Sequence, residues 1–202
     1  MSWFERYAAR LLKGARDPFI RTAMRRAIAS YRKNTAAALS RFPETLERKK
    51  VVRKIKEESI PKMEELVRKA KDSIEDQNGH AYIAKTVKDA LEILHDLVGT
   101  GKLIVKAKSL TMEEIDVNRH LEEWGNTVYE TDLGEFLVQA AGEHPMHILS
   151  PAIHMPRERA APLISKVTGK RLPPDIAQLV GAVREFLRKK YFEADIGLTG
   201  AN

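Results

Sequence analysis

The chain has 202 residues, of which 43% are hydrophobic and 31% charged, with a net charge of +7 and no cysteine. This length suits one core with a helical extension, and no apolar run approaches the roughly 20 residues that cross a bilayer. The lack of cysteine excludes disulfides, thiolate nucleophiles, cysteine-ligated zinc and ordinary iron–sulfur clusters from these residues.

The first residues place apolar side chains at helical spacing. Trp3, Phe4, Tyr7 and Leu11 share one face and alternate with arginines and Glu5. This pattern lacks the continuous apolar core of a secretory signal, so we expect a cytoplasmic protein. A mitochondrial presequence and a docking helix both remain open, because an Arg-rich amphipathic start is compatible with either.

Two longer helices are predicted next. Asp17 before Pro18 is typical of an N-cap and first turn, and opens a helix that runs to about residue 39. A third helix is predicted over 44–76, with a kink or restart at Pro61. We therefore divide the chain into a basic helical extension, 1–76, and a partial α/β domain over residues 77–202.

The excess of positive charge lies in this helical extension. Clustered lysine and arginine favour nucleic acid, an anionic membrane surface or an acidic protein partner. No signature of a nucleic-acid reader accompanies the charge. A solvated face or a protein-docking surface is therefore preferred, and nucleic acid is the least favoured partner.

After the extension, short apolar runs alternate with helical stretches. Strands are predicted over the runs HAYIA, KLIVKA, TVYET and MHILS, at residues 80–84, 102–107, 127–131 and 146–150. Helices are predicted over residues 86–98, 111–124, 132–142, 156–168 and 175–192. This alternation predicts the α/β class, with a mostly parallel sheet and flanking helices.

Polar residues follow two of these strands, at the sheet edge where open α/β folds bind ligands. Ser109 or Thr111 can cap the next helix, or Lys108 with exposed backbone N–H groups can hold an anion. After the following strand, Asp132 is a natural N-cap, and Glu135 three residues later predicts a capping box. Capping alone accounts for these carboxylates at this stage.

The histidines do not form a recognisable metal motif. His144 and His147 flank a proline in a loop, so no metal site is predicted. His154 follows a predicted strand and is a candidate for a ligand contact, although capping or packing explains it equally well. No Walker loop, dinucleotide fingerprint or GxSxG elbow occurs, so no catalytic residue is predicted.

The order of three segments, KSLTMEEIDVNRHLEEWG, then VYETDLGEFLVQAAGEHPMHILSPAIH, then DIGLTGAN, resembles the LUD (lactate-utilisation) domain family. The ETDLGE and SPAIH segments are the most specific. The resemblance implies a fold similar to the ribose-phosphate isomerase and coenzyme A transferase superfold. It also implies a role in NAD-independent oxidation of L-lactate to pyruvate, with cysteine-ligated iron–sulfur clusters carried by a following ferredoxin-like segment.

The chain reaches TGAN where family members continue into the rest of the sheet and the cluster ligands. We therefore expect an incomplete sheet, and either a fragment, a shortened paralogue or one piece of a split protein. No cofactor is expected in this chain. Iron–sulfur clusters are expected in the missing C-terminal part or in a partner subunit.

The resemblance carries over a set of motif residues: Lys108, Ser109, Glu113, Glu114, Asn118, Glu130, Asp132, Gly134, Glu135, His154, Gly197, Gly200, Ala201 and Asn202. From these, the predicted ligand-binding set is Lys108, Ser109, Asn118, Glu130, Asp132, His154, Gly200 and Asn202.

Two functions follow as hypotheses. The first is a LUD-type component of a lactate-oxidising system that binds a small anionic ligand or a redox partner without carrying electrons itself. The second is a non-catalytic module whose basic helices dock on an iron–sulfur subunit. Homo-oligomerisation remains open, and whether the chain is an enzyme is left undecided.

Overall fold

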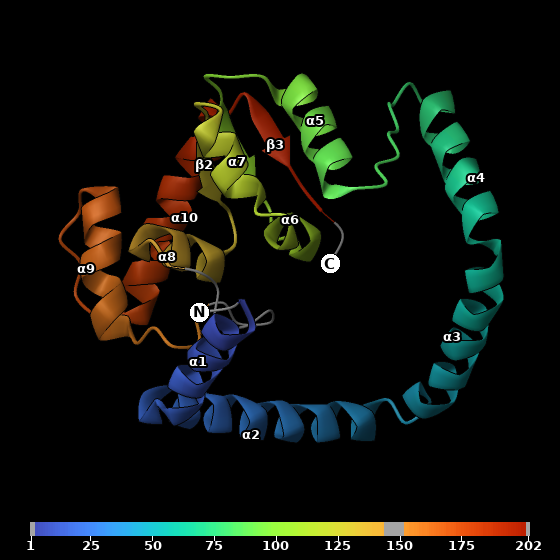
Figure 1. Cartoon of the computed structure of the whole chain (residues 1–202). Helices are drawn as coiled ribbons and strands as arrows, with labels where there is room; N and C mark the ends of the chain where they lie inside the picture. The colour runs from blue at the N-terminus through green and yellow to red at the C-terminus, as the bar shows by residue number, and fades with distance from the viewer. Residues whose placement is uncertain (1–2, 144–151, 201–202) are drawn as a thin grey trace. The chain divides into compact units, whose positions relative to one another are not determined.

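The computed structural model describes residues 3–143 and 152–200 (Figure 1). By its internal contacts the chain divides into two units, residues 24–84 and residues 1–23 with 85–202. The side chains of Trp3, Phe4 and Tyr7 and the predicted strand 146–150 lie outside the described part. Within that part, no helix combines the length and apolar character needed to cross a membrane.

The N-terminal half is helical, as predicted. Its elements are α1 (Trp3–Arg16), α2 (Pro18–Arg41), α3 (Thr45–Ser59), the 3-10 turn η1 (Ile60–Lys62) and α4 (Met63–Asp76). Asp17 begins α2, because its Oδ1 accepts hydrogen bonds from the N–H groups of Phe19 and Ile20 at 2.8 and 3.1 Å. Pro61 lies in η1, which interrupts the helix where the sequence predicts a kink.

Three parallel strands form the sheet of the second half, in the order β2-β1-β3. They are β1 (Leu103–Lys106), β2 (Thr127–Glu130) and β3 (Ile196–Leu198). The helices around them are α5 (Val87–Val98), α6 (Leu110–Glu114), α7 (Val117–Glu123), α8 (Leu133–Ala141), α9 (Arg157–Thr168) and α10 (Ile176–Glu193). The predicted α/β class, with a parallel sheet and flanking helices, is confirmed.

Each face of the sheet has its own core. Ile104 and Val128 face α5 and α7, where Val98, Val117 and Leu121 complete one buried cluster. The other cluster joins the buried side chains of α8, α9 and α10: Phe136, Ala160, Ala161, Ile164, Leu179, Ala182 and Val183. A sheet covered on both faces keeps water from its strands, so any charged side chain on an inner strand is buried as well.

Two predictions of secondary structure are wrong in detail, and one strand was not predicted. Residues 80–84 form no strand, because the run pairs with no other strand and leaves Tyr82 and Ile83 more than half exposed. The helix predicted over 111–124 is two helices, broken at Asp116, whose φ of 52° is left-handed. The short run Ile196–Leu198, which was not predicted, pairs with β1 and extends the sheet.

Candidate functional site

Two opposite charges meet at the carboxyl ends of the inner strand and its neighbour. Lys106 ends β1 and Glu130 ends β2, and the parallel register places them side by side. Because side chains two apart along a strand share a face, both point to the same side of the sheet as Ile104 and Val128. Both residues are buried, with 1% and 3% of their surface exposed.

These two side chains form a closed network with α7. Lys106 Nζ lies 2.8 Å from Glu130 Oε1, and Asn118 donates a 2.6 Å hydrogen bond from Nδ2 to the same oxygen. The break in the helix at Asp116 starts α7 one residue before Asn118 and so allows this approach. A buried ion pair needs such additional hydrogen bonds, because desolvation of two charges otherwise outweighs their attraction.

A second pair of opposite charges lies beside the first. Lys108, in the loop after β1, places Nζ 3.2 Å from Oε1 of Glu135 on α8. Glu135 is 4% exposed, and this burial raises the pKa of its carboxyl group above the ordinary value. The positive charge of Lys108 lowers this pKa, whereas the negative charge of Glu113 on α6 raises it further. The carboxyl group of Glu135 therefore loses its proton less readily than an exposed glutamate does.

This arrangement corrects the predicted capping box. Asp132 does cap α8, since its Oδ1 accepts hydrogen bonds from the N–H groups of Gly134 and Glu135. The Glu135 carboxylate does not return to the cap; it turns toward Lys108 and Glu113 instead. The sequence places Glu135 at the right helical position but does not show that its side chain is buried.

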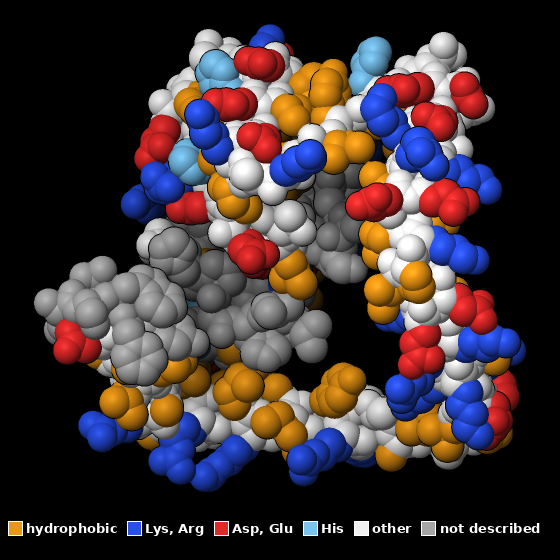
Figure 2. All heavy atoms as spheres, turned by 45° about the vertical axis from the view of Figure 1, so that its right-hand side comes forward, with side chains coloured by type: hydrophobic (Ala, Val, Ile, Leu, Met, Phe, Trp, Pro, Cys, Tyr) orange, Lys and Arg blue, Asp and Glu red, His pale blue; other side chains and the backbone are white. Residues whose placement is uncertain are grey.

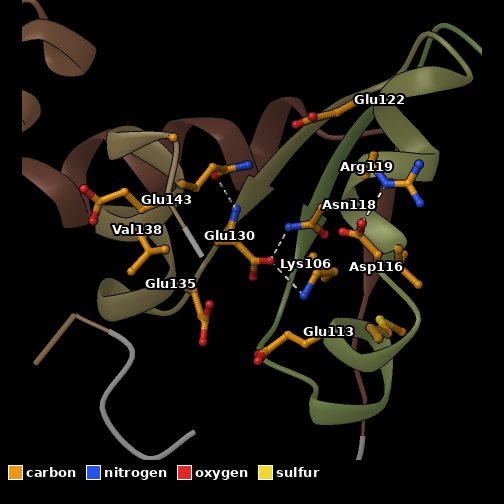
Figure 3. A pocket seen from close by; sticks show the side chains of 14 residues that line it. Lys106, Glu113, Asp116, Asn118, Arg119, Glu122, Glu130, Glu135, Val138 and Glu143 are labelled. Carbon is orange, nitrogen blue, oxygen red and sulfur yellow. Dashed lines mark hydrogen bonds and ion pairs between the residues drawn. The ribbon is translucent and has the colours of Figure 1, made fainter. Parts of the chain in front are cut away.

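The two pairs border a pocket of about 300 Å³ (Figure 3). Lys106, Asn118, Glu130, Glu135 and Glu113 converge on it from β1, α7, β2, α8 and α6. Its lining is completed by Met112, Asp116, Val117, Arg119, Glu122, Val138, Gln139, Gly142 and Glu143. The pocket therefore lies at the carboxyl edge of the parallel strands, where ligands bind in folds of this class.

Four oxygen atoms of this group are buried without a hydrogen-bond partner. They are Glu113 Oε1, Asn118 Oδ1, Glu130 Oε2 and Glu135 Oε1, and of these only Glu135 Oε1 lies within ion-pair distance of a lysine, Lys108, at 3.2 Å. Buried polar atoms are nearly always paired, because an unpaired one costs about 1 to 3 kcal/mol. Glu113 Oε1, Asn118 Oδ1 and Glu130 Oε2 thus mark the part of the pocket where a hydrogen-bond donor can bind.

His154 joins a neighbouring network. Its Nε2 donates to Glu143 Oε2 at 2.8 Å, and Arg159 pairs with the other oxygen of that carboxylate. The hydrogen bond from His154, with a further contribution from Arg159, lowers the pKa of Glu143. Glu143 lines the pocket whereas His154 does not, so His154 acts on the pocket through its partner.

Ser109 and Gly200 also lie together. Ser109 is buried and caps α6, accepting a hydrogen bond from the Met112 N–H at 3.3 Å. The segment after β3 brings Gly200 against it, so that a Cβ added at position 200 would lie 2.5 Å from Ser109 Cβ and closer still to Oγ. Glycine is required at position 200 because no side chain fits there.

The substitution Gly200→Ala tests this close approach. We expect it to lower the free energy of unfolding by about 1 to 3 kcal/mol, since overpacking forces the buried Ser109 to shift. Gly197→Ala is the matched control, because a Cβ there meets no atom within 4 Å. Equal midpoints for the two variants in urea unfolding would contradict the assignment.

The predicted ligand-binding residues thus fall into several groups. Asn118 and Glu130 lie in the pocket, and Lys108 reaches it through Glu135. Ser109 and Asp132 cap helices, and Gly200 packs against Ser109. His154 pairs with Glu143, and Asn202 lies outside the described residues.

Lys106 was missed by the sequence analysis. Its signal was a lysine at the end of an apolar run that is predicted to be an inner parallel strand, where both faces are covered. A lysine at such a position is buried and needs a carboxylate partner.

A metal or cluster does not fit the described residues. The described part contains no group of three or more metal-binding side chains with suitable placement. His144 and His147 lie outside it. The 202 residues contain no cysteine, so they supply no thiolate ligand for an iron–sulfur cluster.

Comparison with known proteins gives a consistent family assignment. Residues 67–202 match the LUD domain model. Lactate utilization protein B 2 of Bacillus mycoides (strain KBAB4) is 30% identical over 200 residues, which cover 98% of this chain and 42% of that relative. Lactate utilization protein B of Bacillus thuringiensis (strain Al Hakam) and of Bacillus cereus (strain B4264) match with the same identity and coverage.

The chain therefore spans less than half the length of the curated relatives that it matches. No solved structure matches it. The similarity to the isomerase and transferase superfold thus stays a prediction.

Proposed function

Because the chain belongs to the LUD domain family, we propose that it is a component of a system that oxidises L-lactate to pyruvate and that its pocket binds a small acid. The observation that carries this proposal is the pocket at the carboxyl edge of β1 and β2. Lys106 lines this pocket, and Lys108 pairs with the lining residue Glu135. The proposal places the chain in the cytoplasm, with electrons carried by iron–sulfur clusters of another segment or subunit.

Lys108 is the residue that we propose for the carboxylate of the acid. Its present partner, Glu135, is buried, and the pKa of this carboxyl is raised. When Glu135 takes up a proton, Lys108 loses its counter-ion and becomes free to pair with an incoming anion. Lys106 remains paired with Glu130, whose Oε1 also accepts the hydrogen bond from Asn118.

Ligand-induced stabilisation tests the proposal. We expect L-lactate to raise the melting temperature of the full chain in a saturable way, because a ligand at a hundred times its Kd adds about 2.7 kcal/mol of stability. Sodium chloride at equal ionic strength should not. Lys108→Met is expected to abolish the shift. The substitution also removes the cation beside the buried Glu135, so the shift is measured against the variant's own, lower unliganded melting temperature. No shift with any small carboxylic acid or with phosphate would refute the proposal.

A second function, docking on an iron–sulfur subunit, is supported by the helices of residues 24–84. None of α2, α3, η1 and α4 contains a buried residue. Helix α2 carries six basic and no acidic side chains, and hydrophobic side chains are exposed along the same helices (Figure 2). Such a surface suits an acidic protein partner.

Charge reversal on α2 tests the docking function. We expect the tagged full chain to retain an iron–sulfur partner during purification, and the triple change of Arg25, Arg26 and Arg32 to glutamate to lose it. The matched control reverses three exposed bases of the other unit, Lys166, Arg171 and Arg184. Equal retention by both variants, or a monomer without partner in the wild type, would contradict docking through α2.

A further inference from the structure

Helix α4 and the turn before it carry an apolar stripe that the described part of the chain leaves exposed. Its residues follow one another at intervals of three and four positions: Ile60, Met63, Val67, Ala70 and Ile74. This spacing places side chains on one face of a helix and is the one that two paired helices share. Figure 2 shows hydrophobic side chains gathered along one side of α4. The stripe therefore becomes buried only against a partner.

The helices themselves need such a partner. Helices α3 and α4 have 15 and 14 residues, and neither contains a buried residue. Isolated helices of this length are only marginally stable in water. Their exposed ion pairs, such as Arg53 with Glu57 and Lys54 with Glu58, add little stability. Burial of the apolar stripe is therefore the main contribution available to hold this segment in helical form.

The preceding helix presents a basic surface beside its apolar residues. Val52 and Ile60 lie in a hollow of about 430 Å³ along α3. Four basic side chains also line this hollow: Arg48, Lys49, Arg53 and Lys56. In total α3 carries six basic and three acidic side chains, whereas α4 carries three basic and five acidic ones. The sign of the net charge therefore changes at η1, between the two helices.

We propose that residues 45–76, which we call the α3–α4 arm, bind the same arm of a second copy of this chain in antiparallel orientation. Figure 1 shows α3 and α4 end to end, with η1 between them. A two-fold axis at η1 places α3 of each copy against α4 of the other. Both contacts then pair a basic helix with an acidic one, and the apolar stripes cover each other. A parallel pair would set like charge against like.

Charge distinguishes this surface from that of α2. Helix α2 carries six basic and no acidic side chains, so two copies of it repel each other. The α3–α4 arm instead contains both signs of charge, arranged so that one copy complements another. Self-association therefore uses the arm and leaves α2 to a different, acidic partner. This inference does not depend on the acid-binding pocket.

Sedimentation equilibrium of the full chain over a range of concentrations tests the self-association. We expect a reversible dimer with twice the 22.9 kDa mass of one chain. Met63→Gln combined with Val67→Gln should raise the Kd of the dimer at least about 100-fold, because polar side chains then replace two apolar ones in each copy of the interface. Glutamine is a good helix former, so the double variant keeps the helix.

Glu65→Gln combined with Lys69→Gln is the matched control. It introduces the same residue twice, again four positions apart, but on the side of α4 that lies away from the stripe. Both positions are exposed, and the two lost charges cancel. The Kd of the dimer should therefore stay at the wild-type value.

Single cysteines report the orientation of the two copies, because the chain contains no cysteine of its own. Ile60→Cys, in η1 near the two-fold axis, is expected to form a disulfide between the copies under oxidising conditions. Ile74→Cys is not expected to do so. In the antiparallel pair its two copies lie about 40 Å apart, at 1.5 Å for each helical residue.

Each contrary result overturns a stated part of the inference. A wild-type chain that stays monomeric at every concentration overturns the self-association. An equal Kd for the stripe variant and its control overturns the stripe as the interface. A disulfide through Ile74→Cys overturns the antiparallel orientation. The measurement on the wild-type chain needs no variant to fold.

Discussion

Lys106→Met is expected to lower the free energy of unfolding by about 3 to 5 kcal/mol. The substitution leaves Glu130, 3% exposed, without its cation in the interior of the sheet. Methionine fills much of the space of the lysine stem, so the loss reports the unpaired charge rather than a cavity. Urea unfolding followed by Trp124 fluorescence in a Trp3→Phe background measures it, because Trp124 packs on the cluster that contains Ile104.

A double substitution separates charge from packing. Lys106→Met combined with Glu130→Gln removes both charges and keeps an acceptor for Asn118, so it should cost at least about 2 kcal/mol less than the single change. Lys88→Met is the matched surface control, since its ion pair with Glu92 is largely exposed and is worth about 0.5 kcal/mol or less. A loss below about 1 kcal/mol for Lys106→Met would show that the buried pair is not formed in solution.

The helices of this chain follow from local patterns. Proline and aspartate mark where helices begin. Asp17 and Asp132 both cap the helices that the sequence assigns to them, and Asp175 caps the helix predicted over residues 175–192. Apolar spacing of 3.6 residues also places the buried side chains of α8 and α10. These features depend on residues that are close in sequence, so a single sequence is enough to predict them.

The elements that were predicted wrongly or missed depend on contacts between residues that are distant in sequence. The run HAYIA has the composition of a strand, but no partner strand is within reach, and strands exist only as pairs. The three residues of β3 are too short to show a period, and pairing with β1 alone makes them a strand. The left-handed Asp116 carries no clear local signal either, yet it turns Asn118 toward Glu130.

The candidate site also has one part that the sequence predicts and one part that depends on distant contacts. The sequence places polar residues after β1 and β2 and so locates the correct edge of the sheet. It does not show that Lys106 and Glu130 are in register, because register is a property of two strands. It also assigns Glu135 to a cap, since the nearby capping partner is visible in sequence and the distant Lys108 is not.

Acid binding should strengthen as the pH falls. A simple carboxylic acid is ionised above about pH 5, so the ligand itself stays an anion over the relevant range. The group that titrates is Glu135 on α8, which faces Lys108 after β1 and Glu113 on α6, with the Lys106 and Glu130 pair beside it. Burial raises the pKa of Glu135, and anion binding to Lys108 raises it further by removing the opposing cation.

Proton linkage gives the direction in which the affinity for the acid changes with pH. At a pH above the raised pKa of free Glu135, binding of the anion takes up one proton, so the affinity for L-lactate is expected to rise about tenfold for each unit that the pH falls. Below that pKa the proton is already present and the affinity levels off. Glu135→Gln removes the titrating group and frees Lys108 permanently, so its affinity should be high and nearly constant from pH 6 to pH 9.

Calorimetry in two buffers of different ionisation enthalpy measures the number of protons that the chain takes up when the acid binds. The wild-type chain should take up close to one proton per acid bound at the upper end of the range, and Glu135→Gln should take up none. Glu122→Gln is the control, because this carboxylate also lines the pocket but is exposed to solvent. An equal pH slope in the wild type and in Glu135→Gln would assign the proton to another group and remove Lys108 as the anion site.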